Sequence, residues 1–180
     1  MQKTGTALIG FTLESHFLPD FRMEIKILLF CTAMAFTSVL GDNCQAPYVR
    51  IGDGCYFISN DKVSGDAAFA LCAKRGAYLA NFETLEEAMI MKMKLQQKNS
   101  GLHYYVGGRN INRYVTGGDW RWVKNEQMTK MTYYAFGDGE PNGSIAAPQD
   151  CMFFYAQDRY KFHNVMCDSG SYLGGYICEK

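Results

Sequence analysis

The chain has 180 residues, a length typical of a single domain. Its 18 Lys and Arg residues balance 18 Asp and Glu residues, and this zero net charge argues against a nucleic-acid partner, which needs a basic surface. Aromatic residues make up 14% of the chain, enough for a well-packed core. The sequence contains no low-complexity tract, Pro- or Ser-rich linker or obvious repeat.

The N-terminal part, residues 1–41, is predicted to precede the folded domain. Lys26 opens an apolar stretch over residues 27–40, which is shorter than the ~20 residues that span a bilayer. We therefore interpret residues 23–41 as a secretory signal peptide. A signal anchor and a translation start at Met23 are the alternatives. Residues 42–180 are then expected to form a secreted, extracellular domain without membrane contact once the signal is cleaved.

The cysteine count supports export. Cleavage near Gly41 would remove Cys31 and leave an even number of cysteines, as an oxidised domain requires. The remaining cysteines are Cys44, Cys55, Cys72, Cys151, Cys167 and Cys178. Spacing alone does not choose among their possible pairings. A zinc site is disfavoured because the chain has no Cys-x-x-Cys and no His pair at ligand spacing.

Two helices are predicted in the first half of the domain. Ser64 can cap a helix that passes through Cys72, and Gly76 can end it. Thr84 and Glu87 have the spacing of a capping box, in which each side chain binds a free amide of the first turn. The methionines of this second helix are interpreted as core residues rather than as a ligand cluster.

Short strands are predicted on either side of these helices. Residues 44–56 read as a hairpin, and 104–106, 120–123, 151–155 and 176–178 read as strands. Two early helices followed by many short strands indicate an α+β fold.

Several motifs then follow one another along the chain. They are Tyr105-Val106-Gly107-Gly108, Trp120-Arg121-Trp122, Glu140-Pro141-Asn142 and the three terminal cysteines. In this order they resemble the core strand, aromatic pair, sugar-specificity triplet and terminal cysteines of the C-type lectin-like domain family. The resemblance covers residues 44–180. It implies two helices, short antiparallel sheets, a long loop region and the disulfides Cys44–Cys55, Cys72–Cys178 and Cys151–Cys167.

The resemblance also implies a binding site. In this family, side-chain oxygens bind calcium, and the same groups hydrogen-bond two neighbouring hydroxyls of a sugar. Glu140, Asn142 and Asn164 would bind the metal, and these three with Gln149 would bind the sugar. A cis Pro141 would turn the first two side chains toward the ion. Glu-Pro-Asn in the family goes with mannose-type glycans, which are therefore the expected partner, bound by a homo-oligomer for avidity.

The rest of the predicted site departs from the family pattern. Gln149 stands where a Glu is usual, and His163 and Asn164 replace an Asn and an Asp. Imidazole is a poor partner for calcium, and two of three expected carboxylates are lost, with Asp150 or Asp138 as candidate substitutes. The acids of the family's second calcium site are replaced by Asn110, Tyr114 and Gly143.

A modification motif overlaps the same site. Asn142-Gly143-Ser144 is an N-glycosylation sequon, and a glycan on Asn142 would block coordination.

The expected function is therefore a secreted, calcium-dependent, mannose-type lectin that is not an enzyme. The alternative is a calcium-independent module that binds protein or mineral matrix through exposed aromatics such as Tyr104, Tyr114 and Tyr160. An enzyme is disfavoured because no nucleophile lies in a recognisable motif and Glu140 with Asp150 is an unspecific carboxylate pair.

Overall fold

The computed structural model describes residues 44–180. The predicted extension and signal peptide, residues 1–41, lie outside this range, so the structure does not test them. Within the described part, no helix has the length and apolar character needed to cross a membrane.

An N-terminal hairpin forms within the predicted segment, but its second strand continues beyond residue 56. Strand β1 (Val49–Ile51) pairs antiparallel with β2 (Gly54–Val63), and the Cys44–Cys55 disulfide links the segment before β1 to β2. The other two disulfides, Cys72–Cys178 and Cys151–Cys167, are also those that the family resemblance implied.

The first helix, α2 (Gly65–Lys74), has the predicted boundaries. The Ser64 side chain accepts a hydrogen bond from the backbone N of Ala67 at 3.3 Å and so satisfies an amide of the first turn. After Arg75 the chain reaches Gly76 at φ +63°, a left-handed conformation that glycine adopts without strain.

The second helix, α3 (Leu85–Lys98), begins with the predicted capping box. The Thr84 Oγ1 accepts from the backbone N of Glu87 at 3.2 Å, and the Glu87 carboxylate accepts from the backbone N of Thr84 at 3.1 Å. The helix ends at Asn99, which is left-handed at φ +47°.

One sheet runs through the domain in the order β1-β2-β9-β4-β5-β6, with β3 on β9 and β7 joining β4 to β8. Its remaining strands are β3 (Tyr78–Leu79), β4 (Tyr104–Asn110), β5 (Trp120–Lys124), β6 (Gln127–Lys130), β7 (Cys151–Tyr155), β8 (Lys161–Val165) and β9 (Gly174–Glu179). The β4–β9 pair is parallel and the other pairs are antiparallel. A short 3-10 helix, η1 (Ala156–Asp158), joins β7 to β8.

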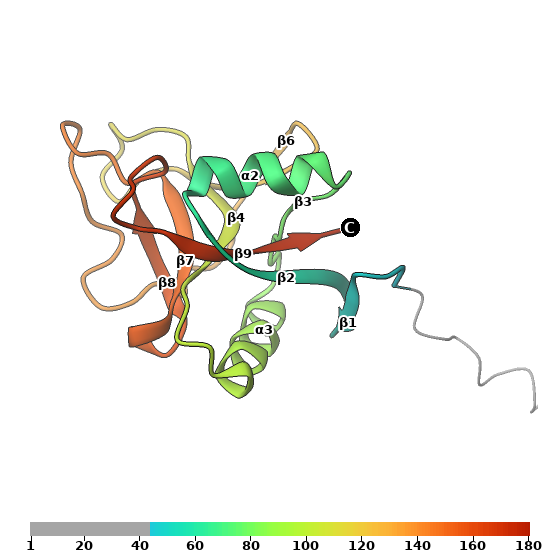
Figure 1. Cartoon of the computed structure of the whole chain (residues 1–180). Helices are drawn as coiled ribbons and strands as arrows, with labels where there is room; N and C mark the ends of the chain where they lie inside the picture. Colours follow the sequence, from blue (N-terminus) through green and yellow to red (C-terminus); the bar gives the residue numbers. More distant parts are fainter. Residues whose placement is uncertain (1–43) are drawn as a thin grey trace, which may run out of the picture. The chain divides into compact units, whose positions relative to one another are not determined.

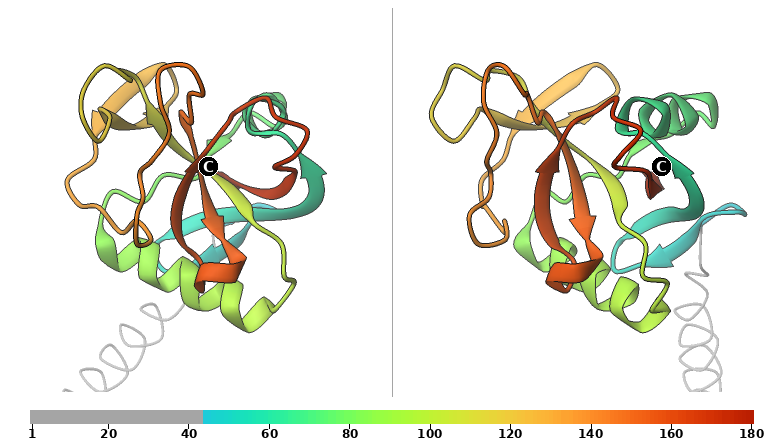
Figure 2. Two further views of the ribbon diagram at one scale, coloured as in Figure 1. Left: turned by 90° about the vertical axis from the view of Figure 1, so that its left-hand side faces the viewer. Right: turned by 60° about the vertical axis from the view of Figure 1, so that its left-hand side comes forward.

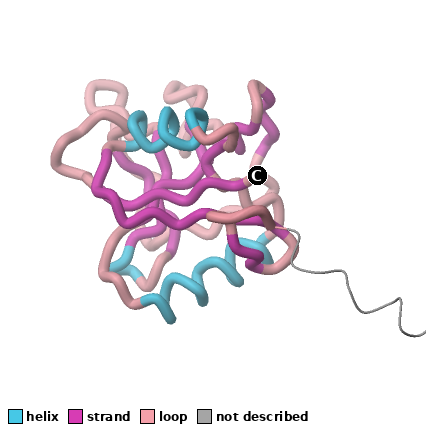
Figure 3. Tube along the Cα trace, turned by 45° about the vertical axis from the view of Figure 1, so that its right-hand side comes forward, coloured by secondary structure: helices cyan, strands magenta, loops and turns pink. Residues whose placement is uncertain are grey.

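The two helices lie on opposite sides of the central strands, α2 above and α3 below β2 and β9 in Figure 1, and the same layers are visible in Figure 3. The long loops gather at the end of the domain away from the C-terminus, and Figure 2 (left) looks onto that end. This arrangement gives the predicted α+β fold with a separate loop region.

Aromatic side chains fill the core between the layers. Phe82 is fully buried and packs edge-on against Trp122, with ring centroids 5.9 Å apart. Burial of such side chains is the main favourable contribution to folding.

Two predictions about apolar residues need correction. On α3, Met91 lies in the core, but Met89 and Met93 are exposed, because they project from the side of the helix that faces away from the sheet. Among the aromatics expected at an interface, Tyr104 and Tyr160 are buried and belong to the core, whereas Tyr114 is 78% exposed. Periodicity and composition alone could not separate these cases.

Candidate functional site

The predicted sugar-binding residues lie on the loop of residues 131–150, between β6 and β7, and on the neighbouring strand β8. Asn164 lies on β8 opposite Met152, with 5% of its surface exposed. Its Oδ1 accepts from the backbone N of Asn142 at 3.0 Å. Its Nδ2 donates to the carbonyl oxygens of Asn142 at 2.7 Å and Gln149 at 3.1 Å. The Asn164 side chain therefore fastens the loop to the sheet.

The three other predicted residues form a chain of hydrogen bonds along this loop. Gln149 Nε2 donates to Asn142 Oδ1 at 2.8 Å, and Asn142 Nδ2 donates to Glu140 Oε1 at 2.8 Å. The Glu140–Pro141 peptide bond is cis, as the resemblance implied. The structure thus brings Glu140, Asn142, Gln149 and Asn164 together, while their part in binding sugar or metal stays a prediction.

His163 lies between two carboxylates. Its Nδ1 is 3.1 Å from Glu140 Oε1, and its Nε2 is 3.0 Å from Asp158 Oδ2, at the end of η1. The hydrogen bond from His163 is the largest cause that holds the pKa of Asp158 below its usual range, and the nearby Lys161 ammonium adds to it. The Tyr155 ring covers the imidazole, with centroids 4.6 Å apart. His163 is therefore hydrogen-bonded to a carboxylate on each side of its ring.

Asp158 was not anticipated from the sequence. It lies five positions before His163, and the tight β7–β8 connection brings the two side chains together. A glycine makes this approach possible: a Cβ on Gly137 would lie 2.4 Å from both Asp158 Oδ2 and His163 Nε2. Nothing in the sequence around Asp158 or Gly137 signals this packing.

The arrangement does not fit a calcium ion. Calcium requires six to eight oxygen ligands, usually with several carboxylates. Here Glu140 supplies the one carboxylate among the predicted ligands, and its Oε1 faces both His163 and Asn142. The side-chain oxygens of Asn142 and Asn164 each accept a hydrogen bond within the loop. An ion would have to displace these bonds and the imidazole.

The candidate substitute acids are also engaged. Asp150 pairs with Arg113 through Oδ2 and accepts from Asn110 Nδ2 at 3.1 Å through Oδ1. Asp138 is fully exposed and lies 3.3 Å from the Lys161 ammonium. At the family's second calcium position, Asn110 Oδ1 instead accepts from the backbone N of Asp119 at 2.9 Å and so shapes the 111–119 loop.

Two hollows adjoin the predicted residues. The first, of about 250 Å³, is lined mainly by amide, hydroxyl and charged side chains. Its polar lining includes Asn110, Arg113, Thr116, Ser144, Asn142, Gln149, Asp150 and Asn164. The second, of about 460 Å³, contains Glu140 and two aromatic side chains, Tyr134 and Phe136. The first hollow therefore offers both hydrogen-bond donors and acceptors, which suits a polyhydroxylated ligand.

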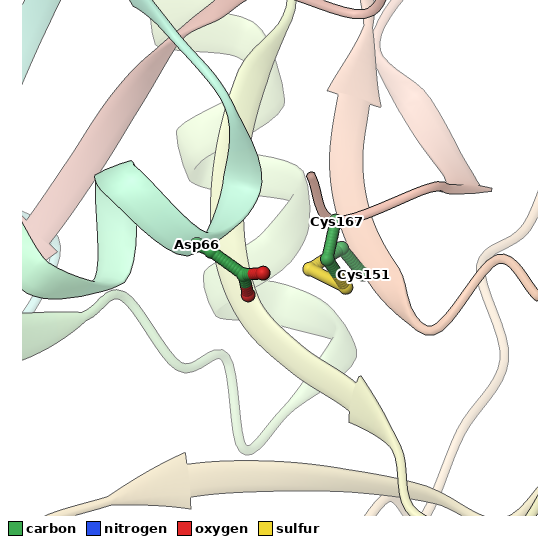
Figure 4. Close-up of side chains that lie close together, drawn as sticks. All are labelled: Asp66, Cys151 and Cys167. Carbon is green, nitrogen blue, oxygen red and sulfur yellow. A yellow bond between two sulfur atoms is a disulfide. The ribbon is translucent and has the colours of Figure 1, made fainter. Parts of the chain in front are cut away.

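A cluster of potential metal ligands elsewhere has a structural explanation. Atoms of Asp66, Cys151 and Cys167 lie within 4.8 Å of one another (Figure 4). The two sulfur atoms form a disulfide, which removes the thiolates that a metal would need. Arg109 donates to Asp66 Oδ1 at 2.8 Å and to Cys167 Sγ at 3.0 Å. This cluster is an ion pair packed on a disulfide.

Comparison with curated proteins shows moderate similarity. The chain is 25% identical over 138 residues to the human protein C-type lectin domain family 6 member A, covering 76% of this chain and 60% of that protein. The chain therefore spans less than two thirds of the length of this curated relative.

Solved structures share the fold. The SPL-1–GlcNAc complex matches with a TM-score of 0.62 at 18% identity, covering 77% of this chain and 95% of that one. The Ca²⁺-independent C-type lectin SPL-2 from Saxidomus purpuratus matches with a TM-score of 0.62 at 21% identity, covering 77% and 94%. The family model of the lectin C-type domain matches residues 61–180. The chain belongs to the C-type lectin domain family.

Proposed function

We propose that this domain binds carbohydrate in the first hollow by direct hydrogen bonds, without a calcium ion. The observation that carries the proposal is the chain of hydrogen bonds from Gln149 through Asn142 to Glu140. This chain already orders the side chains that an ion would otherwise organise. It leaves the remaining amide N–H groups and lone pairs, together with Arg113 and Thr116, to face a ligand.

The fold neighbours support this reading without establishing it. One of them was solved as a complex with GlcNAc, and another is described as a calcium-independent C-type lectin. Both descriptions concern those proteins. They indicate that this fold holds sugars and that some of its members work without calcium. We accordingly propose a binding module rather than an enzyme.

The calcium-dependent, mannose-type lectin that the sequence predicted is the second candidate. The observation that favours it is the adjacency of the Glu140 and Asn142 side chains on either side of the cis Pro141, the arrangement that the resemblance implied for two ligands of one ion. Against it stand the His163 imidazole on Glu140 and the amide at position 149. This candidate requires the loop to rearrange, whereas direct binding does not.

Affinity chromatography separates the two candidates. The purified, oxidised full chain is passed over immobilised mannose and immobilised N-acetylglucosamine, in millimolar calcium and then in EDTA. Retention that survives EDTA is the expected result. Release by EDTA would replace the proposal with the calcium-dependent lectin. Flow-through of a folded chain in both conditions would contradict carbohydrate binding and favour a protein or mineral partner.

A pair of matched variants ties retention to the hollow. Gln149→Leu removes an amide from its wall and is expected to reduce retention. Gln97→Leu makes the same change on an exposed position of α3, away from the loops, and should have no effect. Mass spectrometry of the chain shows whether Asn142 carries a glycan, since a modified Asn142 would obstruct the same hollow.

The cellular setting is also a proposal. We expect an extracellular location because three disulfides persist in oxidising compartments. Since one shallow sugar site binds weakly, we expect a homo-oligomer to supply avidity.

A further inference from the structure

The second hollow lies directly beside the first. Both are bounded by Pro141 and by the loop residues Thr116, Gly117 and Gly118. These residues form a wall that the two hollows share, with the polar first hollow on one side and the aromatic second hollow on the other. The loop of residues 111–119 and the loop of residues 131–150, which carries Glu140 and Pro141, lie at the same end of the domain in Figure 2. A ligand longer than one sugar could therefore cross from one hollow to the other.

The aromatic side of the second hollow is an ordered surface. Tyr134 is 60% exposed, and its ring stacks on Phe136 at 6.4 Å with an interplanar angle of 21°. Phe136 in turn packs on the buried Trp120 at 5.3 Å. The preceding residue, Tyr133, turns inward and donates its hydroxyl to the carbonyl oxygen of Phe82 at 2.8 Å. The Tyr134 ring is thus held outward as the end of an aromatic stack that begins in the core.

The carboxylate beside the second hollow is enclosed by its neighbours. Glu140 lines this hollow, and 11% of its side chain is exposed. Its Oε1 faces His163 and Asn142, but its Oε2 is buried and has no hydrogen-bond partner among the described residues. Neither carboxylate oxygen is therefore open to a ligand hydroxyl in this conformation, and the surface that the hollow offers to a sugar is mainly the exposed Tyr134 ring.

We propose that the second hollow is a subsite for the next sugar of an oligosaccharide whose first sugar occupies the first hollow. The apolar C–H face of that sugar lies on the Tyr134 ring. The inference rests on the proposed carbohydrate binding and adds to it a preference for chains over single sugars. An exposed, ordered aromatic ring matches a pyranose, which has an apolar face.

The test compares single sugars with short chains by titration calorimetry on the oxidised full chain. The probes are methyl mannoside and N-acetylglucosamine, each with its di- and trisaccharide. Wild type is expected to bind the longer chains more tightly than the single sugars. Tyr134→Ala is expected to lose about tenfold in affinity for the chains and little for the single sugars. Tyr134→Phe retains the ring and should retain the preference.

A tyrosine outside both hollows supplies the control. Tyr172 is 45% exposed, and Tyr172→Ala should leave the chain-to-monosaccharide affinity ratio unchanged. The subsite is refuted if sugars bind but wild type shows no preference for chains, or if Tyr134→Ala leaves that preference intact. If wild type binds none of the sugars, the carbohydrate-binding proposal fails as well, and the two failures are distinguishable.

Discussion

The scaffold and the loop site of this domain are held together by different forces. In the scaffold, apolar side chains such as Phe82 and Trp122 pack between the layers, and Cys72–Cys178 joins α2 to β9 across 106 positions of sequence. In the loop site, a few hydrogen bonds between polar groups, centred on Asn164 and Asn142, hold the backbone in place. The first kind of contact tolerates variation in geometry, while the second depends on direction.

The difference explains why the family fold persists here although the metal ligands have changed. Apolar packing and disulfides do not depend on the residues at positions 149, 163 and 164. His163 faces Glu140, and Asn164 holds the backbone of the loop. Side-chain hydrogen bonds therefore order the loop, while apolar packing and disulfides order the scaffold.

The largest effect is expected from removal of the long-range disulfide. Replacing Cys72 and Cys178 together by Ala should lower the free energy of unfolding by about 4–5 kcal/mol in the chain-entropy model, because the bridge closes a long loop. Replacing Cys44 and Cys55 should cost about 3 kcal/mol, since that loop is short. Denaturant unfolding measures both. Equal losses of unfolding free energy in the two variants would show that the length of the closed loop does not determine how much each disulfide stabilises the domain.

A smaller loss is expected when the loop is released from the sheet. Asn164→Ala removes three hydrogen bonds and should lower the free energy of unfolding by about 2 kcal/mol. It should also speed amide exchange over residues 140–150. Asn164→Asp would place a buried, charged oxygen against the two carbonyl oxygens that Nδ2 contacts, so it should cost at least as much as Asn164→Ala. Unchanged exchange in Asn164→Ala would mean that other contacts order the loop.

Glu140→Gln should separate binding from folding. The neutral amide weakens the hydrogen bonds to Asn142 and His163, which costs about 1–2 kcal/mol and leaves the domain folded. Sugar affinity should fall at least about tenfold, because Asn142 loses its orientation. Exposed Glu126→Gln is the matched control, and calorimetry with circular dichroism gives both readouts. Full sugar binding by Glu140→Gln would refute the assignment of the site.

The smallest effects concern pH and have opposite signs in the two regions. Burial is the main cause that raises the pKa of Glu179 on β9, so the folded state holds this proton more tightly than the unfolded state. Its contribution to stability is therefore present at low pH and is lost as pH rises through the folded pKa. The His163 hydrogen bond lowers the pKa of Asp158, so that contribution is present above the usual Asp range and is lost as pH falls below it.

Unfolding measured against pH for two variants checks these signs. Glu179→Gln keeps an acceptor for the backbone N of Asn81 and should remove the destabilisation that accompanies rising pH. Asp158→Asn should flatten the loss of stability at acid pH. Because Asp158 is open to solvent, its effect should be the weaker of the two and should shrink in salt. If both substitutions changed the pH dependence of the unfolding free energy in the same direction, the predicted contrast between the two regions would be wrong.

Much of the scaffold could be predicted because its signals are local. The caps at Ser64 and Thr84 bind amides within three residues, so their spacing is visible in the sequence. The disulfide pairing was not local, and the family resemblance supplied it. The positions of Met89 and Met93 were missed because the direction of each face of α3 depends on where the sheet packs.

The candidate site divides in the same way. The sequence by itself determined the helix boundaries, part of the strands and the identity of the Glu140-Pro141-Asn142 segment, but it gave no sign of β3, β6 or β8. Only the tertiary structure decided that His163 and Asp158 meet beside Glu140, and that Tyr134 faces outward while Tyr133 is tied to Phe82. Local structure follows from hydrogen bonds and periodicities a few residues long, whereas a binding site depends on which distant segments the folded core brings into contact.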